Sequence, residues 1–190
     1  MSRIGILGGT FDPPHDGHLA LAGAAISELK LSKVIFIPAR VPPHKPVGDV
    51  SPEEDRLAML KLAIAGDNRF ELSEIEFERD GPSFTVDTLT RLKADNPGDE
   101  FFFLIGSDNV SEMEIWHEPD RILKLARVAA AVRPGYSIQG KFADVIETFE
   151  MPPVDISSTA VRERVKSGES ISGMVPGSVE DYIKSKGLYN

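Results

Sequence analysis

The chain has 190 residues, of which 41% are hydrophobic and 27% are charged, and it contains no cysteine. Residues 1–190 are therefore expected to form a single globular domain, and disulfides, thiolate metal sites and thiol nucleophiles are excluded. The formal net charge of −9 argues against nucleic acid as a partner, whereas a small phosphorylated ligand needs only a local cluster of basic side chains.

The N-terminal residues enter strand-like sequence directly, without a charged and then apolar leader. No apolar run approaches the length that spans a bilayer. We therefore expect a cytoplasmic protein that is neither exported nor inserted in a membrane.

Apolar, β-branched or aromatic runs alternate with helix-like segments along the chain. The expected strands cover residues 3–7, 33–38, 70–77, 100–105 and 127–132, with a weaker one at 144–149. The expected helices cover residues 18–30, 51–65, 85–94, 120–125, 159–166 and 179–186. This order predicts an α/β fold with a doubly wound, mostly parallel sheet and helices on both faces. Ligands of such folds bind beyond the carboxyl ends of the strands.

Three of the expected helices have capping signals. Ser51 and Glu54 form the pattern of a capping box, with Pro52 at the first helical position. Ser157 or Ser158 can cap helix 159–166, and Ser178 can cap helix 179–186. Glycines at positions 168 and 187 are expected to end these last two helices.

The stretch "GILGGTFDPPHDGH" (5–18) joins the first strand to the first helix. Gly8 and Gly9 allow a tight turn and a close approach of the backbone to a ligand, and a helix N-terminus suits phosphate. The P-loop lysine and the dinucleotide-binding spacing are both absent. His15 and His18, with Gly17 leaving room for a bulky ligand, can donate hydrogen bonds to phosphate oxygens. Local packing is the alternative for each histidine, and a metal site lacks a third ligand of suitable spacing.

The stretch "ISSTAVRERV" (156–165) is a second candidate for phosphate binding. Ser157, Ser158 and Thr159 at a helix start can donate hydrogen bonds to phosphate, and Arg162 lies one turn further on. An ordinary serine cap followed by an exposed arginine is the alternative.

These two stretches, "GGTFDPPHDGH" and "ISSTAVR", resemble the two motifs of nucleotidyltransferases that carry a His-x-Gly-His element. Further stretches resemble the bacterial nicotinate mononucleotide adenylyltransferase family: "PPHK" (42–45), "GPSFTVDTL" (81–89), "IGSDN" (105–109), Trp116, "RPGY" (133–136) and "YIKSKGLY" (182–189). The resemblance covers essentially the whole chain, with the motifs in the same order. It implies a Rossmann-like nucleotidyltransferase fold.

The resemblance also implies a reaction, in which ATP and nicotinate mononucleotide give nicotinate adenine dinucleotide and pyrophosphate in NAD biosynthesis, with Mg²⁺. Such a transfer needs positioning and charge stabilisation but no protein nucleophile, in keeping with the sequence. Asp12 lies where it could bond the phosphates or approach the metal. No set of carboxylates is arranged to hold Mg²⁺, so no protein metal site is expected and the ion is expected to arrive with ATP.

The resemblance assigns the site residues in three groups. The catalytic residues are His15, His18 and Arg162. The ATP-binding residues are Gly8, Gly9, Thr10, Phe11, His18, Gly106, Asp108, Ser157, Ser158 and Arg162. The mononucleotide-binding residues are His44, Lys45, Thr85, Trp116, His117 and Arg133.

Within these groups, Gly106 is expected to face adenine and Asp108 to bind the ribose hydroxyls, although Asp108 also suits a helix cap. Trp116 is expected to stack on the pyridine ring, and a partly buried anchor is its alternative. Thr85, which also suits an N-cap, and a backbone donor of His117 would bind the nicotinate carboxylate. The basic residues His44, Lys45 and Arg133 would bind the mononucleotide phosphate, and a solvated charge is the alternative for each.

Two rival functions stay open on the sequence. A sister adenylyl- or cytidylyltransferase acting on phosphopantetheine, a polyol phosphate or another small phosphate acceptor would share both phosphate motifs, but it has no evident use for residues 81–89 and Trp116. A nucleotide-binding regulator without turnover would not need His15, His18 and Arg162. The expected partners are ATP and nicotinate mononucleotide, and both a monomer and a homodimer are compatible with the sequence.

Overall fold

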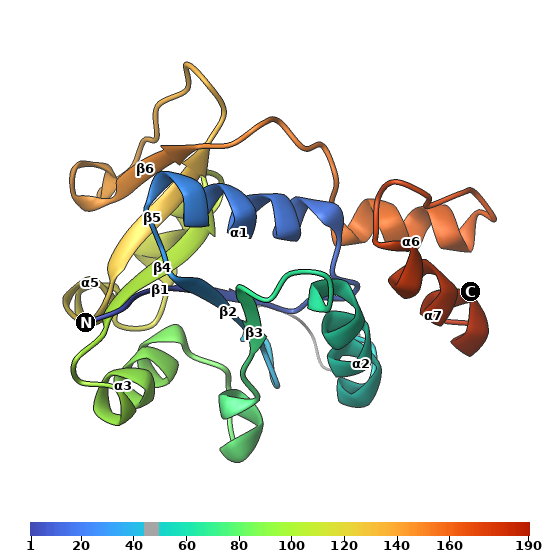
Figure 1. Ribbon diagram of the computed structural model, residues 1–190, viewed down its shortest axis with the longest axis horizontal. Coiled ribbons are helices and arrows are strands. Elements are labelled where there is room, and N and C mark those ends of the chain that lie inside the picture. Colours follow the sequence, from blue (N-terminus) through green and yellow to red (C-terminus); the bar gives the residue numbers. More distant parts are fainter. Residues whose placement is uncertain (44–49) are drawn as a thin grey trace.

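The computed structural model describes residues 1–43 and 50–190. In this part of the chain, six strands form one sheet in the order β3-β2-β1-β4-β5-β6, and each pair of neighbours is parallel (Figure 1). The strands are β1 (Arg3–Gly9), β2 (Lys33–Pro38), β3 (Phe70–Leu72), β4 (Glu100–Gly106), β5 (Arg127–Val132) and β6 (Glu147–Glu150). The strand order reverses between β1 and β4, which is where ligands bind in doubly wound folds.

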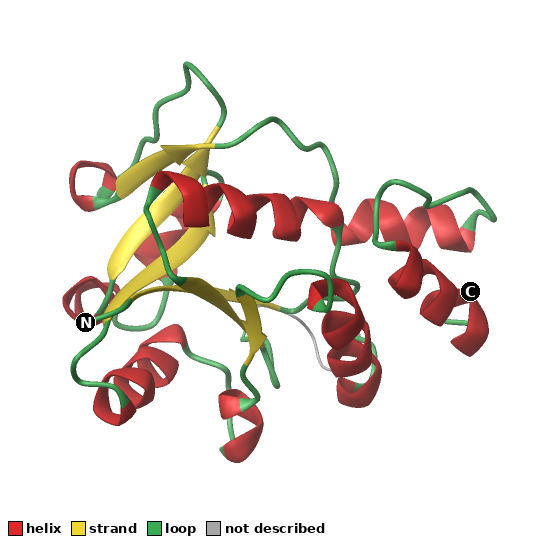
Figure 2. Cartoon of the chain, in the orientation of Figure 1, coloured by secondary structure: helices red, strands yellow, loops and turns green. Residues whose placement is uncertain are grey.

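Helices cover both faces of this sheet, as Figure 2 shows for α1 and α3 on opposite sides. They are α1 (Asp16–Glu28), α2 (Glu53–Ile64), α3 (Thr85–Asp95), α4 (Asn109–Glu112), α5 (Pro119–Leu125), α6 (Ser158–Lys166) and α7 (Gly177–Lys186). Short 3₁₀ turns occur at η1 (Ile75–Glu78), η2 (Met113–Ile115) and η3 (Ala143–Val145). The predicted α/β fold is thus confirmed. No helix in the described ranges has the length and apolar character needed to cross a membrane.

Two hydrophobic cores lie on the two faces, because successive side chains of a strand point in opposite directions. In β4, Phe102 and Leu104 pack in the core that receives apolar side chains from α1, α2, α6 and α7. Phe101 and Phe103 pack in the core that receives side chains from α3, α4 and α5. Strands buried on both sides explain why their sequences are continuously apolar rather than alternating.

Two of the expected strands differ from the structure. The segment expected as strand 70–77 is a strand only over Phe70–Leu72 and continues into the 3₁₀ turn η1, where Glu76 turns inward to a buried partner, Thr88. The weaker strand expected at 144–149 begins at Glu147, because η3 occupies the preceding residues. Both strands lie at the edges of the sheet, where pairing with one neighbour constrains the backbone least.

The capping predictions were right once and wrong twice. Ser157 caps α6, since its hydroxyl oxygen accepts from the Ala160 N–H at 3.1 Å. Ser51 does not cap α2, because the helix begins one residue later than expected and Pro52 is the N-cap. The Ser51 backbone N–H donates to Asp12. Ser178 lies inside α7, and its hydroxyl donates to the Leu62 carbonyl instead.

Candidate active site

A large open cavity of about 1180 Å³ lies at the carboxyl ends of β1, β2, β4 and β5. Most of the predicted site residues line it: Gly8, Gly9, Thr10, His15, His18, Thr85, Gly106, Asp108, Trp116, His117, Arg133, Ser157 and Ser158. Phe11 and Arg162 do not line it, and His44 and Lys45 lie outside the described residues. The parallel topology thus brings most of the separate motifs to one edge of the sheet.

The two histidines of the first motif lie against each other at the start of α1. Their rings stack with centroids 3.7 Å apart, and the backbone N–H of His15 donates to His18 Nδ1 at 3.1 Å. Phe11 packs edge-on against the His18 ring at 4.9 Å. Because Nδ1 of neutral His18 accepts a hydrogen bond, its proton must reside on Nε2, which makes Nε2–H a donor.

Burial keeps both imidazoles neutral. It lowers the pKa of His15 to about 4. Burial and then the nearby His15 lower the pKa of His18 well below its ordinary value. These histidines are therefore uncharged near neutral pH and can serve as hydrogen-bond donors rather than as cations.

The glycines around the histidines make room for rings of the protein itself. A Cβ on Gly17 would lie 2.9 Å from His15 Nδ1, so the absence of a side chain there accommodates the His15 ring. A Cβ on Gly9 would lie 3.0 Å from the ring of Phe11. Gly8 has more space, with Phe103 at 3.7 Å. Gly17 also lines the cavity, so the prediction that it leaves room for a ligand stays a prediction, and the contact that the structure shows at this position is with His15.

Phe11 and Asp12 of the same motif point into the protein. Phe11 has a positive φ of 51°, and its side chain is buried and does not line the cavity. The Asp12 carboxylate is buried and accepts from the Tyr189 hydroxyl at 2.7 Å and the Ser51 N–H at 3.1 Å. Burial and the Asp12 charge raise the pKa of Tyr189, which keeps its hydroxyl a donor. Asp12 thus holds the turn and does not face the cavity, contrary to the predicted role at the phosphates.

The second motif is tied to the first by two hydrogen bonds. Arg162 donates to the Asp12 carbonyl at 2.7 Å, and the Ser158 hydroxyl donates to the Pro13 carbonyl at 2.9 Å. Arg162 therefore does not line the cavity as predicted, because its guanidinium donates to the backbone of the turn at Asp12. The N-terminus of α6, with Ser157 and Ser158 at the cavity, presents free N–H groups and the positive end of the helix dipole.

The loop after β4 forms another wall of the cavity. A Cβ on Gly106 would lie 2.5 Å from Asp108 Oδ1, so the glycine allows the carboxylate to fold back over the strand end. Asp108 occupies the N-cap position of α4 but makes no capping hydrogen bond through its side chain. The alternative role of Asp108 as a helix cap is therefore wrong, and its exposed carboxylate accepts only from Asn109 Nδ2, at 3.1 Å, among the described side chains.

Aromatic rings define the end of the cavity near α3. Trp116 is half-buried and packs edge-on against Phe103, with ring centroids 5.9 Å apart. His117 stacks on Phe84 at 4.4 Å. Thr85 is the first residue of α3 rather than its N-cap, which is Phe84. The Thr85 and Val86 N–H groups have no backbone partner among the described residues, whereas the Asp87 N–H donates to the Phe84 carbonyl at 3.1 Å. Exposed Arg133, after β5, supplies a positive charge on the same cavity.

Buried Arg56, which was not predicted from the sequence, holds loops that border the cavity. Its side chain is 1% exposed and donates to four backbone carbonyls, those of Thr10, Ala39, Arg40 and Ser51, at 2.6–3.2 Å. It thereby ties together the loops that follow β1 and β2. A signal was present, because position 56 shares a helix face with the buried residues Met59, Leu60 and Ala63.

The chemistry available at this site is that of positioned donors. Neutral imidazoles, a helix N-terminus and an arginine can bind and stabilise phosphate oxygens, while aromatic rings can hold a planar ring. The described residues contain no group of three or more histidine, aspartate or glutamate side chains that could hold a metal ion. The arrangement suits group transfer at phosphorus without a protein nucleophile.

Comparisons with known proteins point to the same chemistry. The model of the cytidylyltransferase-like family matches residues 6–164. A probable nicotinate-nucleotide adenylyltransferase of Geobacillus thermodenitrificans is 48% identical over 189 residues, which cover 100% of this chain and 87% of the relative. The nicotinate-nucleotide adenylyltransferase of Bacillus subtilis is 40% identical over 193 residues, covering 100% of this chain and 99% of the relative.

A likeness to a solved structure supports the fold. The nicotinic acid mononucleotide adenylyltransferase of Plasmodium falciparum complexed with NaAD has a TM-score of 0.83 at 21% identity, covering 100% of this chain and 98% of that one. The family model and the sequence relatives place the chain in the cytidylyltransferase-like family and, within it, in the family of nicotinate-nucleotide adenylyltransferases.

Proposed function

We propose that this protein transfers the adenylyl group of ATP to nicotinate mononucleotide, giving nicotinate adenine dinucleotide and pyrophosphate in NAD biosynthesis. The observation that carries the proposal is that one cavity joins a phosphate end, with two neutral histidines, to an aromatic end with free helix N–H groups. The names of the sequence relatives support the same reaction.

At the phosphate end, an oxygen of the mononucleotide phosphate attacks the α-phosphorus of ATP. A new P–O bond forms, the bond to the bridging oxygen breaks, and pyrophosphate leaves with the electron pair. The His18 Nε2–H and the adjacent His15 donate hydrogen bonds to the oxygens on which charge develops. The backbone at Gly8, Gly9 and Thr10 lies along the ATP phosphates.

The second motif closes the phosphate end from the other side. The N-terminus of α6 and the Ser157 hydroxyl donate to the triphosphate, while the Ser158 hydroxyl is already used on Pro13. Arg162 fixes the Asp12 carbonyl and so keeps both motifs at a constant separation. Its positive charge contributes to the potential at the phosphates without lining the cavity.

The two nucleoside ends lie on either side of this centre. Gly106 faces the adenine and Asp108 accepts hydrogen bonds from ribose hydroxyls. Trp116 stacks on the pyridine ring, and the first-turn N–H groups of α3 with the Thr85 hydroxyl and a backbone N–H near His117 bind the nicotinate carboxylate. Arg133 binds the mononucleotide phosphate. His44 and Lys45, assigned to the same phosphate, stay sequence predictions.

Mg²⁺ accompanies the ATP phosphates in this proposal, with water completing its coordination. The described residues offer it no cage, since Asp12 already accepts from Tyr189 and Ser51, so no step is derived through the metal. Residues 1–190 act as one domain in this scheme, because one sheet carries both cores. The cytoplasmic location and the choice between monomer and homodimer stay predictions.

A pyrophosphate-release assay tests the function. ATP is combined with nicotinate mononucleotide, its amide counterpart, phosphopantetheine or a polyol phosphate. We expect turnover with the pyridine mononucleotides and a preference of about tenfold to a hundredfold in kcat/KM for the acid, because a carboxamide opposes its own NH₂ to a donor. Turnover with phosphopantetheine alone would identify a sister transferase, and ATP binding without release would indicate a regulator.

A further inference from the structure

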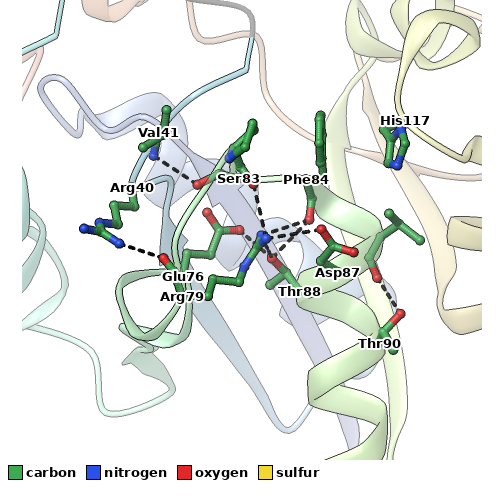
Figure 3. A network of polar contacts seen from close by, with 12 residues as sticks. Arg40, Val41, Glu76, Arg79, Ser83, Phe84, Asp87, Thr88, Thr90 and His117 are labelled. Atoms are coloured by element: carbon green, nitrogen blue, oxygen red, sulfur yellow. Dashed lines mark hydrogen bonds and ion pairs between the residues drawn. The ribbon is translucent and has the colours of Figure 1, made fainter. Parts of the chain in front are cut away.

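A polar network centred on Arg79 includes Glu76, Ser83 and Phe84, which line the aromatic end of the cavity (Figure 3). Arg79 donates to the backbone carbonyls of Pro82 and Phe84 at 3.2 and 3.3 Å. It also donates to the Thr88 hydroxyl at 3.3 Å and to the Asp87 carboxylate at 3.2 Å. The guanidinium thus bridges the loop before α3 and the first turns of that helix.

The network continues into the protein interior. Thr88 is 4% exposed and donates to the Glu76 carboxylate at 2.6 Å, while Glu76 is 7% exposed and belongs to the 3₁₀ turn η1. Glu76 also lines the cavity, and its second carboxylate oxygen is buried without a partner among the described residues. The buried Glu76 carboxylate therefore fixes the Thr88 hydroxyl, and that hydroxyl accepts a hydrogen bond from Arg79.

The residues that Arg79 holds are neighbours of the carboxylate donors. Phe84, whose carbonyl accepts from Arg79, precedes Thr85 in the chain, and the Phe84 ring stacks on the His117 ring. The loop is further pinned by Ser83, whose N–H and hydroxyl oxygen pair with the Val41 backbone. Displacement of Phe84 would therefore shift both groups that face the carboxylate, the Thr85 N–H and the segment at His117.

We propose that Arg79 is a positioning residue that fixes the Pro82–Thr85 turn and thereby sets the preference of the site for a carboxylate over a carboxamide on the pyridine ring. This inference rests on the proposed function. The discrimination requires donors held at fixed positions, because a donor that can turn aside avoids opposing the carboxamide NH₂. Asp87 pairs with the charge of Arg79 at 3.2 Å, so the effect comes from hydrogen-bond geometry rather than from net charge.

The test compares Arg79→Met with Arg91→Met. Arg91 is also an arginine that pairs with acidic side chains at α3, but its contacts are Asp95 at 2.7 Å and Glu78 at 3.8 Å, away from the turn. In Arg79→Met we expect the KM for nicotinate mononucleotide to rise about tenfold and the acid-to-amide ratio of kcat/KM to fall about tenfold. The kcat and the KM for ATP are expected to stay within about twofold, and Arg91→Met to match the unmodified protein.

A second measurement does not depend on turnover. Amide hydrogen exchange is expected to become faster in Arg79→Met at Ser83, whose N–H donates to the Val41 carbonyl, and at Asp87 and Thr88, whose N–H groups donate to the Phe84 carbonyl. Arg79→Lys, which keeps the charge but lacks the planar fork, is expected to be intermediate in both readouts. Thermal unfolding of each variant establishes that the fold is retained.

The inference is overturned if Arg79→Met keeps the acid-to-amide ratio, or if kcat falls equally for both acceptors with the ratio intact, which would indicate a general structural role. Failure of the unmodified protein to use nicotinate mononucleotide would instead contradict the proposed function. In that case unchanged hydrogen exchange in Arg79→Met would overturn the positioning role as well.

Discussion

The two ends of the cavity are built in different ways. At the phosphate end, His15, Asp12 and Phe11 are buried, and their loop is tied to α6 and Tyr189 by direct hydrogen bonds. At the pyridine end, His117 and Arg133 are exposed, and the Pro82–Thr85 turn is held from behind through Arg79.

This difference in burial matches two different functions, the stabilisation of charge during the reaction and the binding and release of substrate. Groups that stabilise developing charge act best when they are buried and fixed before the reaction, because a low dielectric strengthens their hydrogen bonds. Groups that admit and release a substrate must be reachable from solvent. Substitutions at the phosphate end are therefore expected to change kcat, and those at the pyridine end to change the KM for the mononucleotide.

The largest effect is expected from His18→Ala. Loss of the Nε2–H donor should lower kcat by roughly 10²–10⁴-fold with a smaller change in ATP binding, and His15→Ala should behave similarly. Steady-state kinetics measure this, and thermal unfolding separates it from loss of the fold. Near-normal turnover in both variants would reduce the pair to packing residues and remove the contrast between the two ends.

A pH effect on stability is expected from the burial of His15. Its pKa is lowered from 6.5 to about 4 in the folded protein, so between these values the unfolded chain binds a proton that the folded one does not. Stability is present above pH 6.5 and is lost as the pH falls toward 4, by about 1.5 kcal/mol between pH 6.5 and pH 5 from this group. Urea unfolding at the two pH values measures the loss. His15→Gln should remove the part that comes from His15 and keep the part that comes from His18, whose pKa burial also lowers. An equal loss in that variant would show that other groups cause it.

Substitutions of Arg133 and Arg162 test whether the two ends of the cavity bind different substrates. Arg133→Ala is expected to raise the KM for the mononucleotide about tenfold with little change for ATP, because its partner is the acceptor phosphate. Arg162→Ala is expected to raise the KM for ATP and also to lower kcat, since the Asp12 carbonyl loses its donor. If both KM values rise together in both variants, the division of the cationic groups is wrong.

The smallest effects are expected at the pyridine ring. Trp116→Ala should weaken the acid and amide mononucleotides alike, by roughly tenfold, because stacking does not distinguish them. Thr85→Val should mainly reduce the preference for the acid, by a fewfold, since it removes one hydroxyl donor and leaves the backbone donors. Competition kinetics with both mononucleotides test this, and a loss of preference in Trp116→Ala but not in Thr85→Val would reverse the assignments.

The fold was largely predictable because buried parallel strands leave continuous apolar runs. The edge strand at residues 70–77 was overextended, since Glu76 turns into the protein toward Thr88, 12 positions later, and no local pattern indicates that partner. Caps at Ser51 and Ser178 failed for a similar reason. The Ser178 hydroxyl donates to the distant Leu62 carbonyl, and the Ser51 backbone is held by the distant carboxylate of Asp12, with Pro52 at the N-cap position.

The site was predictable where backbone and motif coincide, and less so where support comes from afar. His15, His18, Ser157 and Ser158 line the cavity as expected. The orientation of Arg162 toward the Asp12 carbonyl depends on a residue 150 positions away, and the buried carboxylate of Asp12 on Tyr189, 177 positions away. Spacing along a chain carries no information about such partners.

The lack of a side chain at Gly17 makes the turn that carries His15 sensitive to single-nucleotide mutations. Alanine codons differ from glycine codons only in the second base, so one nucleotide change places a methyl group about where a Cβ would meet His15 Nδ1, at 2.9 Å. The imidazole of His15 would then have to shift, although neither histidine codon had changed. In a population of mutant genes, loss of activity should therefore map to this glycine codon as readily as to the histidine codons themselves.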